Sequence, residues 1–316
     1  MSTRERRDRS NESDRFLSKL FHDAVHTHCE TDTGKEISLA AVGGYGRGEL
    51  SPGSDLDILI VHNGKIGQEK LKAIVNDLLY PLWDKNSVDH SVRTRSETKE
   101  AAASDLRVAT GLLDIRFIAG NADLVGAVRA DSLDYWRKDA KRNLPELEKT
   151  LSERHERAGE LAYLLEPDLK EARGGLRDIQ ALRAISLSGA VQVPLEKISW
   201  AESTLNNVRE ALHTASGRGK DRLLFQEQDK VAKILNYKDA DGMMSDVARA
   251  ARTVDYLLDY TWHALEHKGK DGLGRIMRRP RVVNVAKNVS AVEREIIIDS
   301  LTSFNEDPVV GLRAAA

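Results

Sequence analysis

The chain has 316 residues, of which 41% are hydrophobic, 31% charged and 5% aromatic, and its formal net charge is -2. This balance excludes a bulk polyanion binder, so nucleic acid is not an expected partner, and the scarcity of aromatic residues disfavours a base-stacking surface. A single cysteine excludes a disulfide framework within the chain, and the lack of long apolar runs or an apolar leader predicts a cytoplasmic protein without membrane segments.

The N-terminal part alternates between apolar runs of strand and helix type. The first dozen residues are polar and predict a solvated lead-in, after which apolar spacing predicts a helix over 14–29. Apolar runs predict strands over 37–42 and 55–61, separated by a glycine-rich turn. An amphipathic helix is predicted over 68–83 and a third strand over 87–93. This order indicates a small domain that combines a sheet with helices.

From residue 133 onward the pattern becomes mostly helical. Spacing of about 3.6 residues predicts helices in five segments: 133–163, 176–189, 200–215, 227–236 and 243–267. Near the end of the chain we predict a strand over 281–285 and a helix over 291–301. The pattern therefore divides the chain into a lead-in, a sheet-containing domain, a helical domain and a tail or linker: 1–35, 36–130, 131–270 and 271–316.

Two carboxylates share one face of the second predicted strand. Asp55 and Asp57 are two residues apart, so they project together while Leu56 points the other way. Neighbouring carboxylates repel each other, and a Mg²⁺ ion shared with phosphate oxygens relieves that repulsion. The same alternation on the third strand places Asp89 on its polar face. Asp89 is therefore a candidate third metal ligand, or a base for an attacking hydroxyl.

A glycine-rich turn lies just upstream of these carboxylates. Gly43 and Gly44 allow backbone N–H groups to approach a phosphate closely, and Arg47 offers a charge-assisted donor to the same anion. Ser54, directly before the acidic pair, is also a candidate nucleotide-binding residue. The turn and the carboxylates together predict a phosphoryl-transfer site for a metal-bound nucleoside triphosphate. The glycine spacing matches neither a Walker A loop nor a Rossmann fingerprint.

A further candidate segment lies at 165–179 in the helical half. Gly174 and Gly175 precede a predicted helix, whose N-terminus attracts anions, and Lys170 and Arg177 add positive charge. We expect both basic residues to contact the nucleotide from the helical domain. The alternative interpretation is an inter-domain hinge with ordinary surface charges.

Five stretches of the chain carry a family resemblance: 41–50, 51–57, 90–94, 165–179 and 222–232. In this order they resemble the bacterial PII uridylyltransferase family, within the DNA polymerase β-like nucleotidyltransferase superfamily. The first two stretches alone are typical of nucleotidyltransferases in general. The two long later stretches make the resemblance specific, because they are not part of the general superfamily motif.

The resemblance implies an α+β fold, in which a polymerase β-like nucleotidyltransferase domain with a short mixed sheet precedes a mostly helical domain. It implies transfer of UMP from UTP to a tyrosine hydroxyl of a PII signal protein in nitrogen regulation, with release of pyrophosphate. Gly43 and Gly44 would hold the triphosphate, and Asp55 and Asp57 would hold Mg²⁺ in a two-metal site.

Two alternatives stay open. ATP is a rival to UTP, because some actinobacterial relatives in this family are adenylyltransferases and no motif assigns the base pocket. A catalytically silent nucleotide-binding module is the second alternative, and the intact Asp55 and Asp57 argue against it. Longer family members carry HD and ACT domains that are not seen here, so neither nucleotide removal nor glutamine sensing is expected. The oligomeric state is left open.

Overall fold

The computed structural model describes residues 3–29, 35–83, 88–217, 219–270, 282–287, 289–292, 295–298 and 309–315. The chain forms two compact units, Met1–Leu265 and Glu266–Ala316. No helix in the described part is long and apolar enough to cross a membrane. The described residues that line the candidate site belong to the first unit, and the proposed division of that unit near residue 130 stays a prediction.

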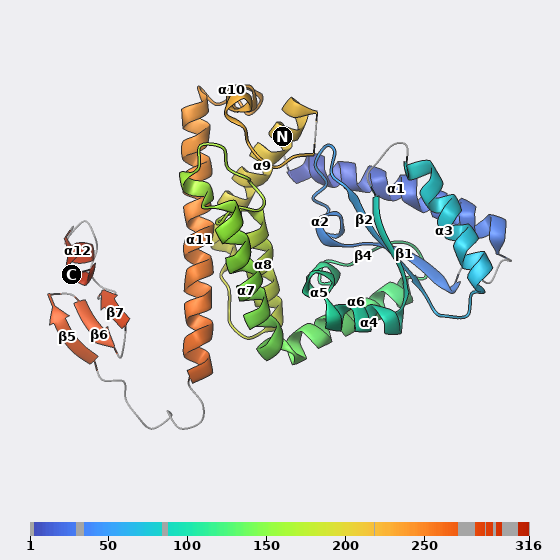
Figure 1. Cartoon of the computed structure of the whole chain (residues 1–316), viewed down its shortest axis with the longest axis horizontal. Coiled ribbons are helices and arrows are strands. Elements are labelled where there is room, and N and C mark those ends of the chain that lie inside the picture. The colour runs from blue at the N-terminus through green and yellow to red at the C-terminus, as the bar shows by residue number, and fades with distance from the viewer. Residues whose placement is uncertain are drawn as a thin grey trace. The chain divides into compact units, whose positions relative to one another are not determined.

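A four-stranded mixed sheet organises the N-terminal half of the first unit (Figure 1). Its strands are β1 (Ile37–Ala41), β2 (Leu56–His62), β3 (Val88–Thr94) and β4 (Arg116–Gly120), in the order β3-β2-β1-β4. β1 runs antiparallel to both of its neighbours, whereas β2 and β3 are parallel. A parallel pair needs a crossover, and α3 (Gln68–Trp83) provides it. The three expected strands and the expected α+β class are confirmed.

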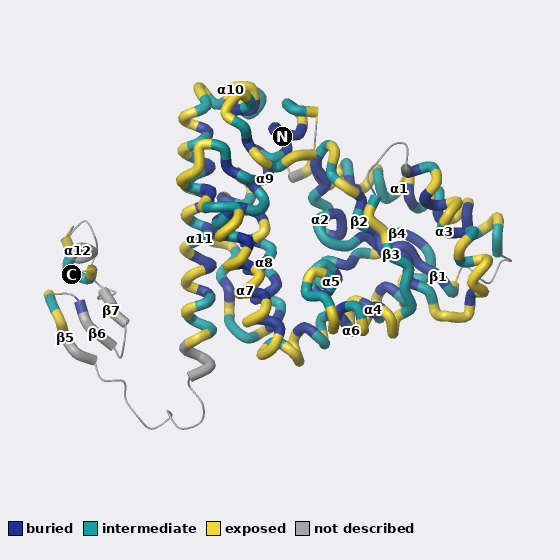
Figure 2. Tube along the Cα trace, viewed as in Figure 1, coloured by how far each residue is buried: buried dark blue, intermediate teal, exposed yellow. Residues whose placement is uncertain are grey.

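The two faces of the sheet pack into two separate cores because neighbouring strand residues point in opposite directions. Leu39, Ile58 and Ile60 pack on one face with residues of α1 (Thr3–His28) and α3. Leu59 and Val61 point to the other face and join the core of the helical half. β1 is buried along its whole length, as Figure 2 shows.

Three helices after β3 begin at side-chain caps. Thr94 and Glu97 form a reciprocal capping box at the start of α4 (Arg95–Ser104). Asp105 caps α5 (Leu106–Leu112), and Asn121 caps α6 (Ala122–Lys138). Asp105 also ends α4, so one residue separates α4 from α5, whereas Thr94 and Asn121 begin helices that directly follow β3 and β4.

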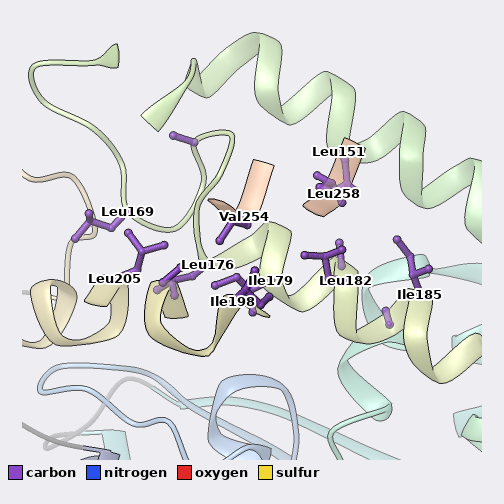
Figure 3. Close-up of a cluster of buried hydrophobic side chains, with 14 of the residues drawn as sticks. Leu151, Leu169, Leu176, Ile179, Leu182, Ile185, Ile198, Leu205, Val254 and Leu258 are labelled. Carbon is purple, nitrogen blue, oxygen red and sulfur yellow. The ribbon is translucent and has the colours of Figure 1, made fainter. Parts of the chain in front are cut away.

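The remaining long helices of the first unit form a layered helical core. They are α7 (Ala140–Ala158), α8 (Leu176–Ser188), α9 (Ser199–Ser216), α10 (Phe225–Ile234) and α11 (Ala240–Lys270). Short 3-10 turns, η2 (Leu161–Tyr163) and η3 (Leu195–Ile198), lie between some of them. Figure 3 shows part of the core, with side chains that α7, α8, α9 and α11 contribute. The expected helical half is therefore present.

Two sequence expectations about helix ends are wrong. The expected solvated lead-in is part of α1, which begins at Thr3, because Arg6 and Ser10 are buried against the rest of the unit. The single helix expected over 133–163 is broken at Asp139, where α6 ends and α7 begins. The break allows Trp136 of α6 and the apolar stripe of α7 to face the same core.

The second unit contains a small antiparallel sheet. Its strands β5 (Val282–Ala286), β6 (Val289–Val292) and β7 (Glu295–Ile298) follow one another, and α12 (Val310–Ala315) comes later in the chain. The strand expected near 281–285 is present, although residue 281 lies outside the described residues. The helix expected over 291–301 is wrong, because the described residues of this segment, 291–292 and 295–298, belong to β6 and β7. Its run of isoleucines favours a strand, where branched side chains pack well.

Candidate active site

A cavity of about 780 Å³ lies between the N-terminal ends of β2 and β3 and the helices α8 and α9. The turn after β1 and part of α5 complete its wall. All nine residues that the sequence analysis selected line this cavity: Gly43, Gly44, Arg47, Ser54, Asp55, Asp57, Asp89, Lys170 and Arg177. The glycine turn, the acidic strand ends and the segment 165–179 are far apart in the sequence, yet they line one cavity.

The glycine turn is built against the carboxylates. β1 ends at Ala41, and the short α2 (Gly43–Gly46) follows. Gly43 has φ +57°, and a Cβ at this position would stand 3.3 Å from Oδ2 of Asp57. The amide of Val42 also donates to the carbonyl oxygen of Asp57 at 3.0 Å. Gly43 is therefore required both for its backbone conformation and for its closeness to an acidic side chain.

The three acidic residues interact electrostatically at the strand ends. Asp57 is paired with Asp89 in the parallel register of β2 and β3, and Asp55 directly precedes β2. Burial raises the pKa of Asp57, and the negative charges of Asp89 and Asp55 raise it further. The positive charges of Lys170 and Arg177 oppose this increase. Both basic residues therefore act on the same carboxylate from the helical half.

The oxygen atoms of the acidic residues suit a hard cation that binds both protein carboxylates and substrate phosphates. Among the described residues, no three His, Cys, Asp or Glu side chains are grouped as a ready-made metal site. Mg²⁺ usually binds one or two carboxylates together with substrate phosphates and water, so Asp55 and Asp57 are a sufficient protein contribution. The mutual repulsion at Asp57 is what a bound cation relieves. Asp89 is exposed, and its role as a third ligand stays a prediction.

Arg47 lies in a chain of ion pairs beside the cavity. Its guanidinium donates to Oε2 of Glu49 at 2.7 Å and to Oδ2 of Asp114 at 2.5 Å, and its side chain is 11% exposed. Arg183 extends the chain by donating to Glu49 at 3.0 Å and to Glu202 at 2.5 Å. Through Glu49 and Arg183, this chain of ion pairs connects the glycine turn with α8 and α9, and the role of Arg47 in binding nucleotide stays a prediction.

Burial opposes the charge of Glu49, yet Arg47 and Arg183 hold its pKa below the ordinary value. For Asp114 and Glu202 burial prevails, and the pKa of each is raised despite its arginine partner. Asp114, Arg183 and Glu202 were not predicted from the sequence, because each comes from a different part of the chain. The only signal was the presence of Glu49 in the same stretch as Arg47.

The segment that carries Lys170 and Arg177 is held by its own backbone. Oδ1 of Asp168 accepts from the amide of Lys170 at 2.9 Å, and the amide of Arg177 donates to the carbonyl oxygen of Lys170 at 3.1 Å. Gly174 has φ +82°, and a Cβ there would stand 2.5 Å from the carbonyl oxygen of Ala251. The start of α8 is thus fitted closely against α11, and both basic side chains begin from a fixed backbone.

Ser54 closes a tight turn before the acidic pair. Its amide donates to the carbonyl oxygen of Ser51 at 3.1 Å, and its hydroxyl accepts from the amide of Ser51 at 3.2 Å. Gly53 has φ +70° within this turn, which is the conformation that glycine adopts at least cost. The hydroxyl therefore helps to shape the backbone that leads to Asp55, and a contact with nucleotide stays a prediction.

Comparison with known proteins gives two matching families. The family described as GlnD PII-uridylyltransferase matches residues 142–188 and 193–262. The nucleotidyltransferase domain family matches residues 27–99, which include the glycine turn and the three acidic residues. The chain belongs to the PII uridylyltransferase family. Lys170 and Arg177 fall within the part that matches the uridylyltransferase family itself.

Curated relatives of this PII uridylyltransferase family member carry the name bifunctional uridylyltransferase/uridylyl-removing enzyme. The protein from Streptomyces coelicolor is 43% identical over 96% of this chain and 37% of its own length. The protein from Mycobacterium tuberculosis is 37% identical over 89% of this chain and 36% of its own length. The protein from Corynebacterium glutamicum is 34% identical over 69% of this chain and 31% of its own length. The chain therefore spans about a third of the length of these relatives.

Proposed function

We propose that this chain catalyses Mg²⁺-dependent transfer of UMP from UTP to a tyrosine hydroxyl of a PII signal protein, with release of pyrophosphate. The observation that carries the proposal is the meeting of the glycine turn, the acidic strand ends and two basic side chains of the helical half around one cavity. UTP is favoured over ATP because the curated relatives are named uridylyltransferases. A PII protein as substrate is supported by the family to which the chain belongs.

The glycine turn, the basic residues and the acidic residues of the cavity have different roles in this reaction. The amides of Gly43 and Gly44 precede the first hydrogen bonds of their turn, which leaves them for the triphosphate. Lys170 and Arg177 add positive charge against the phosphates. Asp55 and Asp57 would hold Mg²⁺, in a two-metal site. When bound, Mg²⁺ neutralises the charge that develops on the phosphate oxygens and favours ionisation of the attacking hydroxyl.

The chemical step is a substitution at the α-phosphorus of UTP. The tyrosine oxygen forms a bond to that phosphorus while the bond to the bridging oxygen breaks, and pyrophosphate leaves with the bonding electron pair. The hydroxyl proton passes to a base, for which Asp89 is the candidate because it is exposed and lies next to Asp57 in register. The remaining contribution of the protein is to position and to stabilise charge.

The test is mass spectrometry of a PII protein after incubation with this chain, Mg²⁺ and either UTP or ATP. We expect a UMP adduct on a tyrosine, and at least about a 100-fold loss of transfer in the Asp55→Asn, Asp57→Asn variant. The variant should fold at least as stably as wild type, because burial and like charge disfavour ionised Asp57. An AMP adduct would instead assign ATP, and nucleotide binding without any adduct would indicate a silent module.

A further inference from the structure

One carboxylate beside the cavity joins three basic side chains. Oδ1 of Asp221 accepts from Nε of Arg209 at 2.6 Å and lies 2.8 Å from Nε2 of His213. Its other oxygen lies 3.8 Å from Nζ of Lys170. The Asp221 side chain is 11% exposed, so these contacts are largely shielded from water. None of the expected site residues except Lys170 takes part in this cluster.

Two members of the cluster also contact the turn that leads to the acidic pair. Nδ1 of His213 donates to the carbonyl oxygen of Pro52 at 2.9 Å, because a carbonyl oxygen only accepts. Arg209 donates to the hydroxyl of Ser51 at 3.2 Å. Both contacts come from α9 and fix the backbone that precedes Asp55. The position of Asp221 is therefore set relative to the acidic strand ends.

The backbone around Asp221 is fitted just as closely. A Cβ at Gly219 would stand 2.3 Å from the carbonyl oxygen of Gly53, so the loop before Asp221 lies directly against the turn. The carbonyl oxygen of Asp221 accepts from the amide of Leu169 at 2.9 Å. The loop, the turn and the segment that carries Lys170 thus form one hydrogen-bonded unit.

The basic side chains around Asp221 keep its carboxylate ionised, so that it can hold Lys170 by charge. Burial opposes the ionised carboxylate, but the hydrogen bond from His213 and the charges of Arg209 and Lys170 prevail and lower the pKa of Asp221 to about 2. Asp57, Lys170 and Asp221 line the same cavity, and the charge of Lys170 opposes the rise that burial and the neighbouring carboxylates cause in the pKa of Asp57, so its ammonium lies within electrostatic reach of both carboxylates. Lys170 therefore interacts both with Asp221 and with the carboxylate of Asp57.

We propose that Asp221 is a positioning residue, which holds the ammonium of Lys170 beside Asp57 where the triphosphate binds. This inference rests on the proposed function. A lysine side chain has four rotatable carbon–carbon bonds, and only part of its conformers place the charge at the phosphates. An ion pair with a fixed carboxylate selects those conformers before the nucleotide arrives, which is preorganisation. Asp221 itself contacts neither nucleotide nor metal in this role.

A double-mutant cycle on the full chain tests the proposal. The variants are Asp221→Asn, Lys170→Met and their combination, and the measurements are kcat and KM for transfer to PII. The dissociation constant of a non-hydrolysable UTP analogue is measured alongside and does not depend on turnover. We expect Lys170→Met to weaken analogue binding and kcat about tenfold, and Asp221→Asn about threefold or more. In the Lys170→Met background, Asp221→Asn should change either quantity by less than about twofold.

The outcomes separate this inference from the proposed function. If the two effects multiply in the double variant, Asp221 does not act through Lys170 and the inference is wrong, although transfer by wild type stands. If wild type transfers no nucleotide to PII, the proposed function fails, and the cycle on analogue binding still decides whether Asp221 positions Lys170. A merely structural role for Asp221 would lower the melting temperature and leave the coupling with Lys170 at zero.

Two further variants complete the design. Asp229→Asn on the exposed surface of α10 is the matched control, since it removes one carboxylate charge outside the cluster. It should leave kcat, KM and analogue binding unchanged. If Asp221→Asn does not fold, Asp221→Glu replaces it in the cycle. The glutamate keeps its charge for Arg209 and His213 but shifts the carboxylate by one methylene, and the same coupling with Lys170 is expected.

Discussion

At the scale of single residues, the closeness of Gly43 to Asp57 leads to a sharp prediction. In Gly43→Ala, the new methyl group would stand about 3.3 Å from Oδ2 of Asp57, on a backbone with φ +57°. We expect the free energy of unfolding to fall by about 1–2 kcal/mol. Transfer of nucleotide should fall at least about tenfold, because the carboxylate has to move. Urea denaturation and initial rates measure the two effects.

Gly48→Ala is the matched control for this prediction. Gly48 has φ +73°, but nothing lies within 4 Å of the position that a Cβ would take. The control should therefore lose a similar free energy of unfolding and keep most of its transfer activity. Equal losses of activity in the two variants would mean that backbone strain, and not the crowding of Asp57, is responsible.

Asp221 provides a second prediction at this scale, through the pH dependence of stability. The folded state lowers its pKa from the ordinary 3.8 to about 2. A lowered folded pKa stabilises the protein above the unfolded value, and this stabilisation is lost as the pH falls through about 2. Between pH 5 and pH 2, the free energy of unfolding of wild type should fall by about 2 kcal/mol more than that of Asp221→Asn. Parallel pH profiles for the two proteins would contradict this.

At the scale of secondary-structure elements, the first turns of α1 are tied to α9. Arg6 and Arg9 each donate to the buried carboxylate of Glu210 at 3.0 Å, and Arg9 also donates to the carbonyl oxygen of Leu50 at 2.6 Å. Arg6 and Glu210 are almost fully buried. Removal of Arg6 leaves the buried carboxylate of Glu210 with Arg9 alone, so its charge is compensated only in part, which is destabilising. α1 therefore holds the segment before the acidic pair against the helical half.

This cluster of Arg6, Arg9 and Glu210 predicts that Arg6→Ala lowers the free energy of unfolding by about 2–3 kcal/mol, since Arg9 still pairs with Glu210. Arg4→Ala in the same helix should cost less than about 0.5 kcal/mol, because the side chain of Arg4 is 89% exposed and its partner Asp8 is exposed as well. Urea denaturation of both variants measures the difference. Similar small losses in the two variants would show that α1 does not depend on its buried charge cluster.

At the scale of the whole molecule, the cavity is lined by residues of the first compact unit. Every residue that lines the cavity lies between Val42 and Asp221, within the first unit. The second unit has its own antiparallel sheet. Removal of residues 271–316 should therefore leave the affinity for a non-hydrolysable UTP analogue unchanged within about twofold. Calorimetric titration of the shortened and full chains measures this, and a larger loss would assign part of the site to the second unit.

Short-range sequence patterns were sufficient to predict the acidic residues and the glycine turn of the site. A period of two along a strand places Asp55 and Asp57 on one face, and a glycine turn needs no distant partner to be recognised. Such features depend on neighbours in the sequence, so they could be predicted before the fold was known. The parallel register that pairs Asp57 with Asp89 follows from two strands joined by one helix, which is also a short-range pattern.

Only the tertiary structure decided which distant residues hold these groups in place. His213 reaches Pro52 across 161 positions of the sequence, and Arg6 reaches Glu210 across 204. Neither contact leaves a periodic pattern, and the polar start of α1 looked like a solvated lead-in for this reason. The sequence by itself determined which residues are candidates for the site, because backbone parity and turn geometry are local. The support of the site was decided by packing between elements, because burial and charge pairing depend on contacts that exist only in the folded chain.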